Sequence, residues 1–67
     1  MELSARNQLQ GTVTEVKLGG IMAEVTVDVA GQTMVAAITR SSAERLALKV
    51  GDAVTVIIKS TEVMLGK

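Results

Sequence analysis

Two short stretches near the ends of the chain carry side chains that could bind an anion. Ser4, Arg6 and Asn7 place a hydroxyl, a guanidinium and an amide within four residues, and the run 59–61 (Lys-Ser-Thr) places an ammonium beside two hydroxyls. Neither stretch contains a carboxylate. Charge-assisted hydrogen bonds from such donors to an oxyanion are strong. The competing interpretation, favoured by composition alone, is that Arg6 and Lys59 are solvated charges at strand ends.

Other chemistry finds little support in the residue types. The chain has no His and no Cys, which removes the ordinary catalytic triad, a thiol nucleophile, disulfides and a common zinc site. No glycine-rich loop carries the Lys-Ser or Lys-Thr pair of a phosphate-binding P-loop. Met22, Met34 and Met64 fit packing better than soft-metal ligation, because methionine is a flexible gap-filler. We therefore expect no enzyme, no catalytic residues and no metal ligands.

Charge and composition also restrict the partners. Seven basic and seven acidic residues give zero net charge, and aromatic residues are absent. A nucleic-acid binder normally carries a basic surface or stacking aromatics. No apolar run approaches the roughly 18 residues of a membrane span, and the start of the chain lacks the features of a signal peptide. We expect a soluble cytoplasmic protein with no nucleic-acid and no membrane partner.

The size of the chain predicts a single domain, 1–67, that associates with itself. A domain of 67 residues is marginally stable alone and usually needs a disulfide, a metal or oligomerisation. The first two are excluded here by the missing Cys and His. The hydrophobic fraction of 48% is more than so short a chain can hide within itself. Oligomerisation remains.

The apolar pattern predicts an all-β fold of five strands, at 9–18, 21–29, 33–38, 53–59 and 62–65. Ser41 and Glu44 match a capping box and predict a short helix between the third and fourth strands. Alternation places five apolar residues on one face of the second strand: Ile21, Ala23, Val25, Val27 and Val29. The third strand is apolar on both faces, which predicts that both are covered.

Glycines and one break in the alternation add detail. The pattern is interrupted between Val13 and Val16, which predicts a bulge in the first strand. Gly11 predicts a tight bend or a close approach of another backbone. Turns are expected at 19–20 and 30–31, where glycine supplies positive φ. The element order matches the five-stranded OB-fold barrel, whose closure removes most exposed edges.

Several segments together resemble one family. The opening 4–13 (SARNQLQGTV) is similar to the start of the molbindins, small molybdate-binding proteins built from one transport-associated OB (TOBE) domain. Further matches cover 35–39, the helix at 41–46, 48–52 and 56–61, so the resemblance spans nearly the whole chain. The opening Ser-Ala-Arg-Asn is fairly specific, whereas Val-Gly-Asp before a strand is generic. The resemblance implies a free-standing binder, because no helix-turn-helix and no ATPase motif is present.

The resemblance also implies a site and an assembly. Molbindins form hexamers, as trimers of dimers, with molybdate or tungstate held at subunit interfaces, so the charges of Arg6 and Lys59 need not come from one chain. The implied roles are storage or buffering of the oxyanion, with no other cofactor. Carried over by position, the oxyanion contacts are Ser4, Ala5, Arg6, Thr39, Lys59 and Ser60.

Two other functions stay open at this stage. One is an OB-fold nucleic-acid-binding protein, which the missing aromatics and zero net charge disfavour. The other is a structural oligomerisation module without a ligand, which the donor-rich stretch at Ser4–Asn7 disfavours. Sequence does not separate molybdate from tungstate, or storage from delivery.

Overall fold

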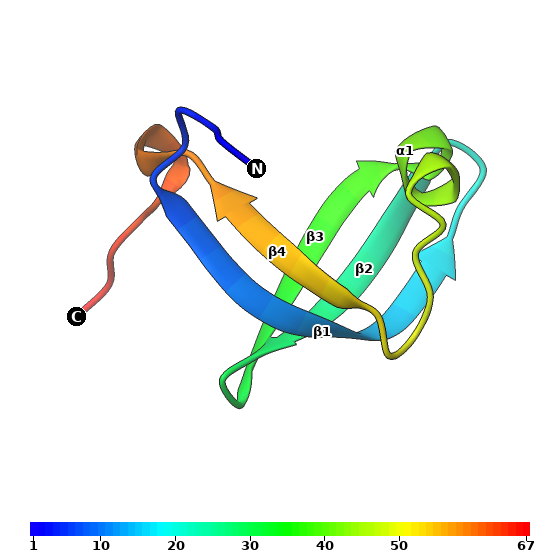
Figure 1. Ribbon diagram of the computed structural model, residues 1–67, viewed down its shortest axis with the longest axis horizontal. Helices are drawn as coiled ribbons and strands as arrows, with labels where there is room; N and C mark the ends of the chain where they lie inside the picture. The colour runs from blue at the N-terminus through cyan, green and yellow to red at the C-terminus, as the bar shows by residue number, and fades with distance from the viewer.

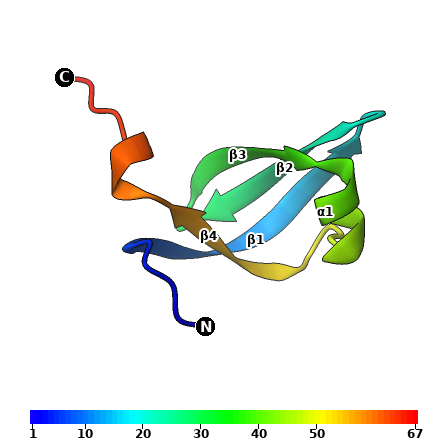
Figure 2. The ribbon, with the colours of Figure 1, turned by 90° about the horizontal axis from the view of Figure 1, so that it is seen from above.

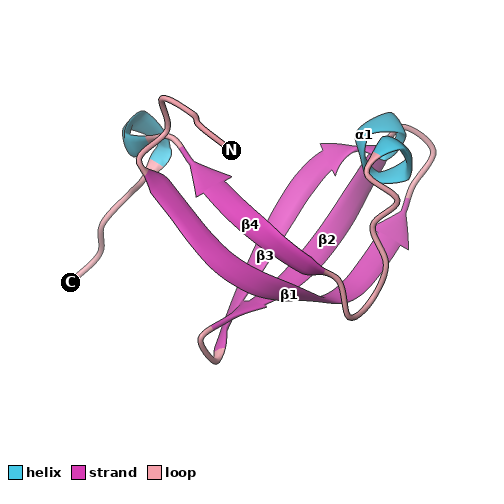
Figure 3. Cartoon of the chain, in the orientation of Figure 1, coloured by secondary structure: helices cyan, strands magenta, loops and turns pink.

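The computed structural model describes residues 1–67 and contains four strands, one α-helix and one 3-10 turn. The strands form one antiparallel sheet in the order β3-β2-β1-β4 (Figure 1). Figure 3 shows the two helical turns at opposite ends of the curled sheet. The elements are β1 (Asn7–Leu18), β2 (Met22–Val29), β3 (Gln32–Thr39), α1 (Arg40–Arg45), β4 (Ala53–Ile58) and the 3-10 turn η1 (Ser60–Glu62).

The predicted fifth strand at 62–65 is wrong, and so is the closed barrel. Glu62 ends η1, and the residues after it have no regular structure. Met64 and Leu65 are 91% and 95% exposed, and the tail leaves the body of the molecule beyond η1 (Figures 1 and 2). The tail turns away at η1 and does not pair with β3 or β4, so both strands remain sheet edges. The all-β class and the helix between the third and fourth strands are confirmed.

Strand β1 joins the two halves of the sheet by bending. Its first half pairs with β4 and its second half with β2. The register to β2 shifts between Val13 and Glu15, which confirms the predicted bulge. A Cβ on Gly11 would lie 2.5 Å from Val27 Cγ1 and 2.9 Å from the Asp28 carbonyl oxygen. The predicted close approach at Gly11 is therefore also confirmed, and only glycine fits there without movement of β2.

The core is small and lies inside the curl of the sheet. Only five of 67 residues are buried, and all are apolar: Val13, Ala23, Val25, Val27 and Ala43. The inner face of β2 is the predicted one, except that Ile21 lies in the turn before the strand and is 80% exposed. Val35 on β3 is 60% exposed, so this chain by itself does not cover both faces of β3.

Helix α1 begins at Arg40, earlier than its sequence pattern predicts. Thr39, not Ser41, is the N-cap, and its hydroxyl accepts a 3.1 Å hydrogen bond from the Ser42 amide. Glu44 does not return to the Ser41 amide and instead accepts a 3.1 Å bond from Arg40 Nε. The capping box is therefore wrong, because the extended end of β3 already supplies a threonine hydroxyl. With six residues, α1 is too short to cross a bilayer, and no other helix is long and apolar enough.

The chain turns at both predicted positions, but the predicted positive φ is found only at 30–31. Ala30 and Gly31 both have positive φ, 51° and 84°, which is the backbone of a tight two-residue hairpin turn. Gly19 and Gly20 do not have positive φ. Gly19 is instead needed for space, because a Cβ there would lie 2.7 Å from the Met22 carbonyl oxygen.

Candidate anion-binding site

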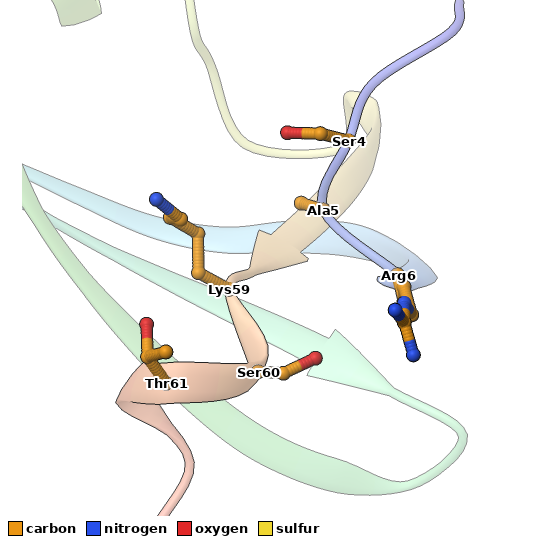
Figure 4. Close-up of a pocket in the computed structure, with 6 residues that line it drawn as sticks. All are labelled: Ser4, Ala5, Arg6, Lys59, Ser60 and Thr61. Atoms are coloured by element: carbon orange, nitrogen blue, oxygen red, sulfur yellow. The ribbon is translucent and has the colours of Figure 1, made fainter.

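The β1–β4 ladder brings the two donor-rich stretches together. Its last pair is Asn7 with Ile58, so the residues that precede Asn7 and follow Ile58 become neighbours. Together they line a solvent-open cavity of about 270 Å³. The lining residues are Ser4, Ala5, Arg6, Lys59, Ser60 and Thr61 (Figure 4).

Two hydrogen bonds hold these stretches in position, one between the segments and one within the first of them. The Asn7 side-chain amide donates to the Ile58 carbonyl at 3.1 Å, and the Gln8 amide donates to the Ala5 carbonyl at 2.9 Å. On the other side, Lys59 is extended, with φ −65° and ψ 141°, and leads directly into the η1 turn. The first bond fixes the separation of the two segments, and the second fixes the path of the chain into β1.

The cavity contains donors and no carboxylate. None of the side-chain polar atoms of Ser4, Arg6, Lys59, Ser60 or Thr61 takes part in a hydrogen bond or an ion pair within the chain. By contrast, Lys17, Arg40 and Lys49 each lie within 4 Å of a carboxylate. Two cations and three hydroxyls are thus free to bind a ligand.

The side chains face the cavity from both segments. Figure 4 shows the Ser4 hydroxyl and the Ala5 methyl on the side toward Lys59, whereas the Ser60 hydroxyl points toward Arg6. Arg6 and Lys59 therefore reach the cavity from different sides of the paired segments. Both belong to one chain here, so the two charges do not need two subunits to share a cavity.

Five of the six predicted contacts are brought together, and Thr39 is not. Thr39 lies at the end of β3 next to α1, at the opposite end of the sheet from η1 (Figure 1). Its hydroxyl is hydrogen-bonded to Ser42 as the cap of α1. Thr61 also lines the cavity. It belongs to the donor-rich run 59–61 identified from the sequence, but not to the contacts that the family resemblance implies.

The cavity has no side chains of the kind that coordinate a metal cation. Across the chain, no three acidic side chains come close enough to hold a metal ion. Its side chains suit an anion instead, because ammonium, guanidinium and hydroxyl groups donate hydrogen bonds to negatively charged oxygen atoms.

Almost the whole chain matches one known protein family. The family model described as "TOBE domain" matches residues 3–65. The chain belongs to the TOBE domain family, as a molbindin. It is 47% identical, over 66 residues, to molybdenum-pterin-binding protein 3 of Clostridium pasteurianum, with 97% of each chain covered. This molbindin also superimposes on a molybdate-binding protein from Sporomusa ovata with a TM-score of 0.96 and 43% identity, over the full length of both chains.

A longer relative has the same fold in part of its chain. The cytoplasmic molybdate-binding protein ModG, solved with molybdate bound, matches with a TM-score of 0.85 and 33% identity. The match covers 97% of this chain and 53% of ModG. One TOBE domain of this size therefore corresponds to about half of that protein.

Proposed function

We propose that this molbindin binds molybdate or tungstate in the cavity between its two donor-rich segments. The observation that carries the proposal is a cavity lined by two cations and three hydroxyls, none of them engaged elsewhere in the chain and none facing a carboxylate. The names of its relatives support molybdate as the ligand. Its role is binding, as storage or buffering of the oxyanion, and not catalysis.

The chemistry of the anion fits this donor set. Molybdate and tungstate are tetrahedral dianions at neutral pH, so they accept hydrogen bonds and donate none. Arg6 and Lys59 neutralise the charge, while the hydroxyls of Ser4, Ser60 and Thr61 and the Ala5 backbone amide define the shape. Hydrogen phosphate carries a proton that needs an acceptor, and no carboxylate is present. Sulfate has the same charge but is smaller, so a cavity of fixed size can disfavour it.

The proposal places the cavity at a subunit interface in an oligomer, as the hexamer of the family implies. The family pattern assigns an oxyanion contact to Thr39, yet in its own chain Thr39 lies at the opposite end of the sheet from the cavity (Figure 1). Its contribution would therefore come from a neighbouring copy. The small buried core and thirteen exposed large apolar side chains support such association. The compartment we propose is the cytoplasm, in line with ModG, which is described as cytoplasmic.

Native mass spectrometry with and without molybdate tests the proposal in one experiment. The expected result is an oligomer that gains discrete molybdate masses. A monomer would contradict the interface site, and an oligomer that gains no molybdate would contradict oxyanion binding. In the same experiment, Lys59→Ala should reduce the added molybdate mass. Lys17→Ala is its matched control, because it removes the same charge at the far end of β1 and should leave the added mass unchanged.

A further inference from the structure

Two further side chains stand in line behind the exposed hydroxyl of Thr39. Thr39 Oγ1 and Ser42 Oγ are 2.8 Å apart, with the Thr39 hydroxyl as the donor. Ser42 Oγ also accepts a 3.1 Å hydrogen bond from Arg45 Nη2. Thr39 lines an open, mostly polar pocket, whereas Ser42 is half-buried and neither Ser42 nor Arg45 lines that pocket. We call these three side chains the donor relay, with Thr39 as its outer member.

The arginine at the inner end of the donor relay has an unusual partner. Lys17, Arg40 and Lys49 each lie within 4 Å of a carboxylate, but Arg45 does not. The one hydrogen bond of its side chain goes to the Ser42 hydroxyl. Successive hydrogen bonds polarise one another, so a guanidinium that donates to a hydroxyl oxygen makes the proton of that hydroxyl a stronger donor. Arg45 therefore favours donation from Ser42 to Thr39.

The direction of the Thr39–Ser42 bond decides what Thr39 offers to a ligand. A hydroxyl has one proton and two lone pairs, so it can face a ligand as donor or as acceptor. One lone pair of Thr39 is already taken by the Ser42 backbone amide at 3.1 Å. When Ser42 Oγ donates instead of accepting, the second lone pair is taken as well, and only the Thr39 proton points outward. The Ser41 hydroxyl contributes less, because its 3.3 Å separation from Thr39 Oγ1 exceeds the ordinary O–H···O distance.

We propose that the donor relay sets Thr39 as a pure hydrogen-bond donor toward the oxyanion, with Ser42 and Arg45 as its positioning residues. The inference rests on the proposed function, in which Thr39 reaches the cavity of a neighbouring copy. A dianion without a proton accepts the Thr39 proton, and the Thr39–Ser42 bond reverses. Hydrogen phosphate needs an acceptor for its proton and finds none at Thr39. The relay thus turns a hydroxyl, which by itself tolerates either anion, into a group that selects against a protonated one.

The ratio of molybdate affinity to phosphate affinity separates this role from a purely structural one. Ser42→Ala breaks the relay but keeps the backbone amide that donates to Thr39 as the cap of α1. The second lone pair of Thr39 is then free to accept the proton of hydrogen phosphate. Competition calorimetry should show molybdate binding weakened about fivefold, as for the loss of one hydrogen bond, and phosphate binding unchanged or tighter. An unchanged ratio, whether both affinities fall or neither does, overturns the proposal.

Two matched variants act as controls for Ser42→Ala. Ser42→Thr keeps the hydroxyl and should restore the wild-type ratio of the two affinities. Ser41→Ala removes the neighbouring hydroxyl, which receives no hydrogen bond from Arg45, and should change the ratio far less than Ser42→Ala does. A change in Ser41→Ala as large as that in Ser42→Ala overturns the assignment to Ser42.

Arg45→Met covers the case in which Ser42→Ala fails to fold. Arg45 is exposed, so the loss of its guanidinium should leave the fold intact. The ratio of molybdate to phosphate affinity should fall about threefold, because Ser42 loses its charged donor. Where Ser42→Ala folds, adding Arg45→Met to it should change the ratio no further, since the effect of Arg45 passes through Ser42. An equal effect of Arg45→Met with and without the Ser42 hydroxyl would reflect long-range attraction alone and overturns the relay.

Failure of the relay and failure of the proposed function give different results in these titrations. A wild type that binds molybdate, with the same affinity ratio in wild type, Ser42→Ala and Arg45→Met, overturns the relay and leaves oxyanion binding in place. A wild type that binds neither anion overturns the oxyanion function and the relay with it.

Discussion

Asn7 and Ile58 are 51 residues apart in the chain, yet they form the last pair of the β1–β4 ladder, and the Asn7 amide bonds the Ile58 carbonyl at 3.1 Å. This one pair sets the distance between Arg6 and Lys59, which flank it directly. The ligand cavity is thus a consequence of strand register. Residues that never touch the anion can alter its affinity by changing that register.

Replacement of Asn7 by Ala should lower both stability and molybdate affinity. The partly buried Ile58 carbonyl loses its side-chain donor, at a cost of about 1 kcal/mol. For a domain of this size that corresponds to roughly 4–8 °C in melting temperature. Gln10→Ala is the control, because its side-chain amide donates a solvent-exposed hydrogen bond to the Thr55 hydroxyl in the same ladder. If Asn7→Ala melts and binds like wild type, the pair does not set the cavity.

Arg6→Ala and Lys59→Ala should each lose most of the molybdate affinity and still assemble. A hydrogen bond to a charged group contributes about 1.5–3 kcal/mol, or roughly 10- to 150-fold in affinity. Wild type should be stabilised by about 2.7 kcal/mol at a hundredfold excess of molybdate over its dissociation constant. Thermal melting at fixed protein concentration, with and without molybdate, measures this. Full retention of the shift in both variants would contradict the site, as would a wild type that does not respond.

Calorimetric competition should rank the anions by proton content and size. We expect molybdate and tungstate to bind, sulfate weakly and phosphate least, because the cavity offers donors and no carboxylate acceptor. All anions should be compared at the same pH and ionic strength, because salt screens exposed charges. Phosphate binding as tight as molybdate would rule out the all-donor explanation.

Asp52 should make the fold sensitive to acid. Hydrogen bonds from the Lys49 ammonium and amide, at 2.9 and 3.0 Å, hold the pKa of this carboxyl below its ordinary value of 3.8. A lowered folded-state pKa stabilises the fold above the unfolded-state pKa, and this contribution is lost as the pH falls below about 3.8. Asp52→Asn should therefore flatten the dependence of the urea midpoint on pH between about 5 and 2. Lys49→Met should flatten it partly, because the backbone bond persists; an unchanged profile in Asp52→Asn would refute this account.

Gly11→Ala should destabilise the bend of β1, whereas Gly20→Ala should not. A Cβ at Gly11 would overlap Val27 and the Asp28 carbonyl, while a Cβ at Gly20 has no atom within 4 Å. Overpacking of this kind costs typically about 1–3 kcal/mol. Urea unfolding of both variants at equal concentration makes the comparison. Equal midpoints would show that β2 moves aside freely.

The inner side of the sheet could be predicted because its cause is local. Alternation along β2 identified Ala23, Val25 and Val27, all buried, and the broken alternation between Val13 and Val16 located the bulge. Both signals come from the two-residue period of a strand, which sequence displays directly. The run of donors at each chain end likewise identified most of the cavity.

The errors lie where a distant partner decides the structure. The pattern at 62–65 has the apolar alternation of a strand, but a strand exists only if an edge accepts it, and no edge of the same chain does so. Thr39 displaced Ser41 as the helix cap because β3 continues to the residue before the helix. Thr39 was carried to the site from the family, and its distance from the cavity within one chain is visible only in three dimensions.

The segments that lead into and out of the sheet both line the cavity: residues 4–6 precede β1, and residues 59–61 follow β4. A second copy fused to either end is therefore tethered beside that cavity. A short flexible linker holds joined domains at an effective concentration on the order of millimolar. In such a tandem protein, pairing of two domains would no longer depend on dilution, and binding would persist at cellular levels too low for separate chains to meet.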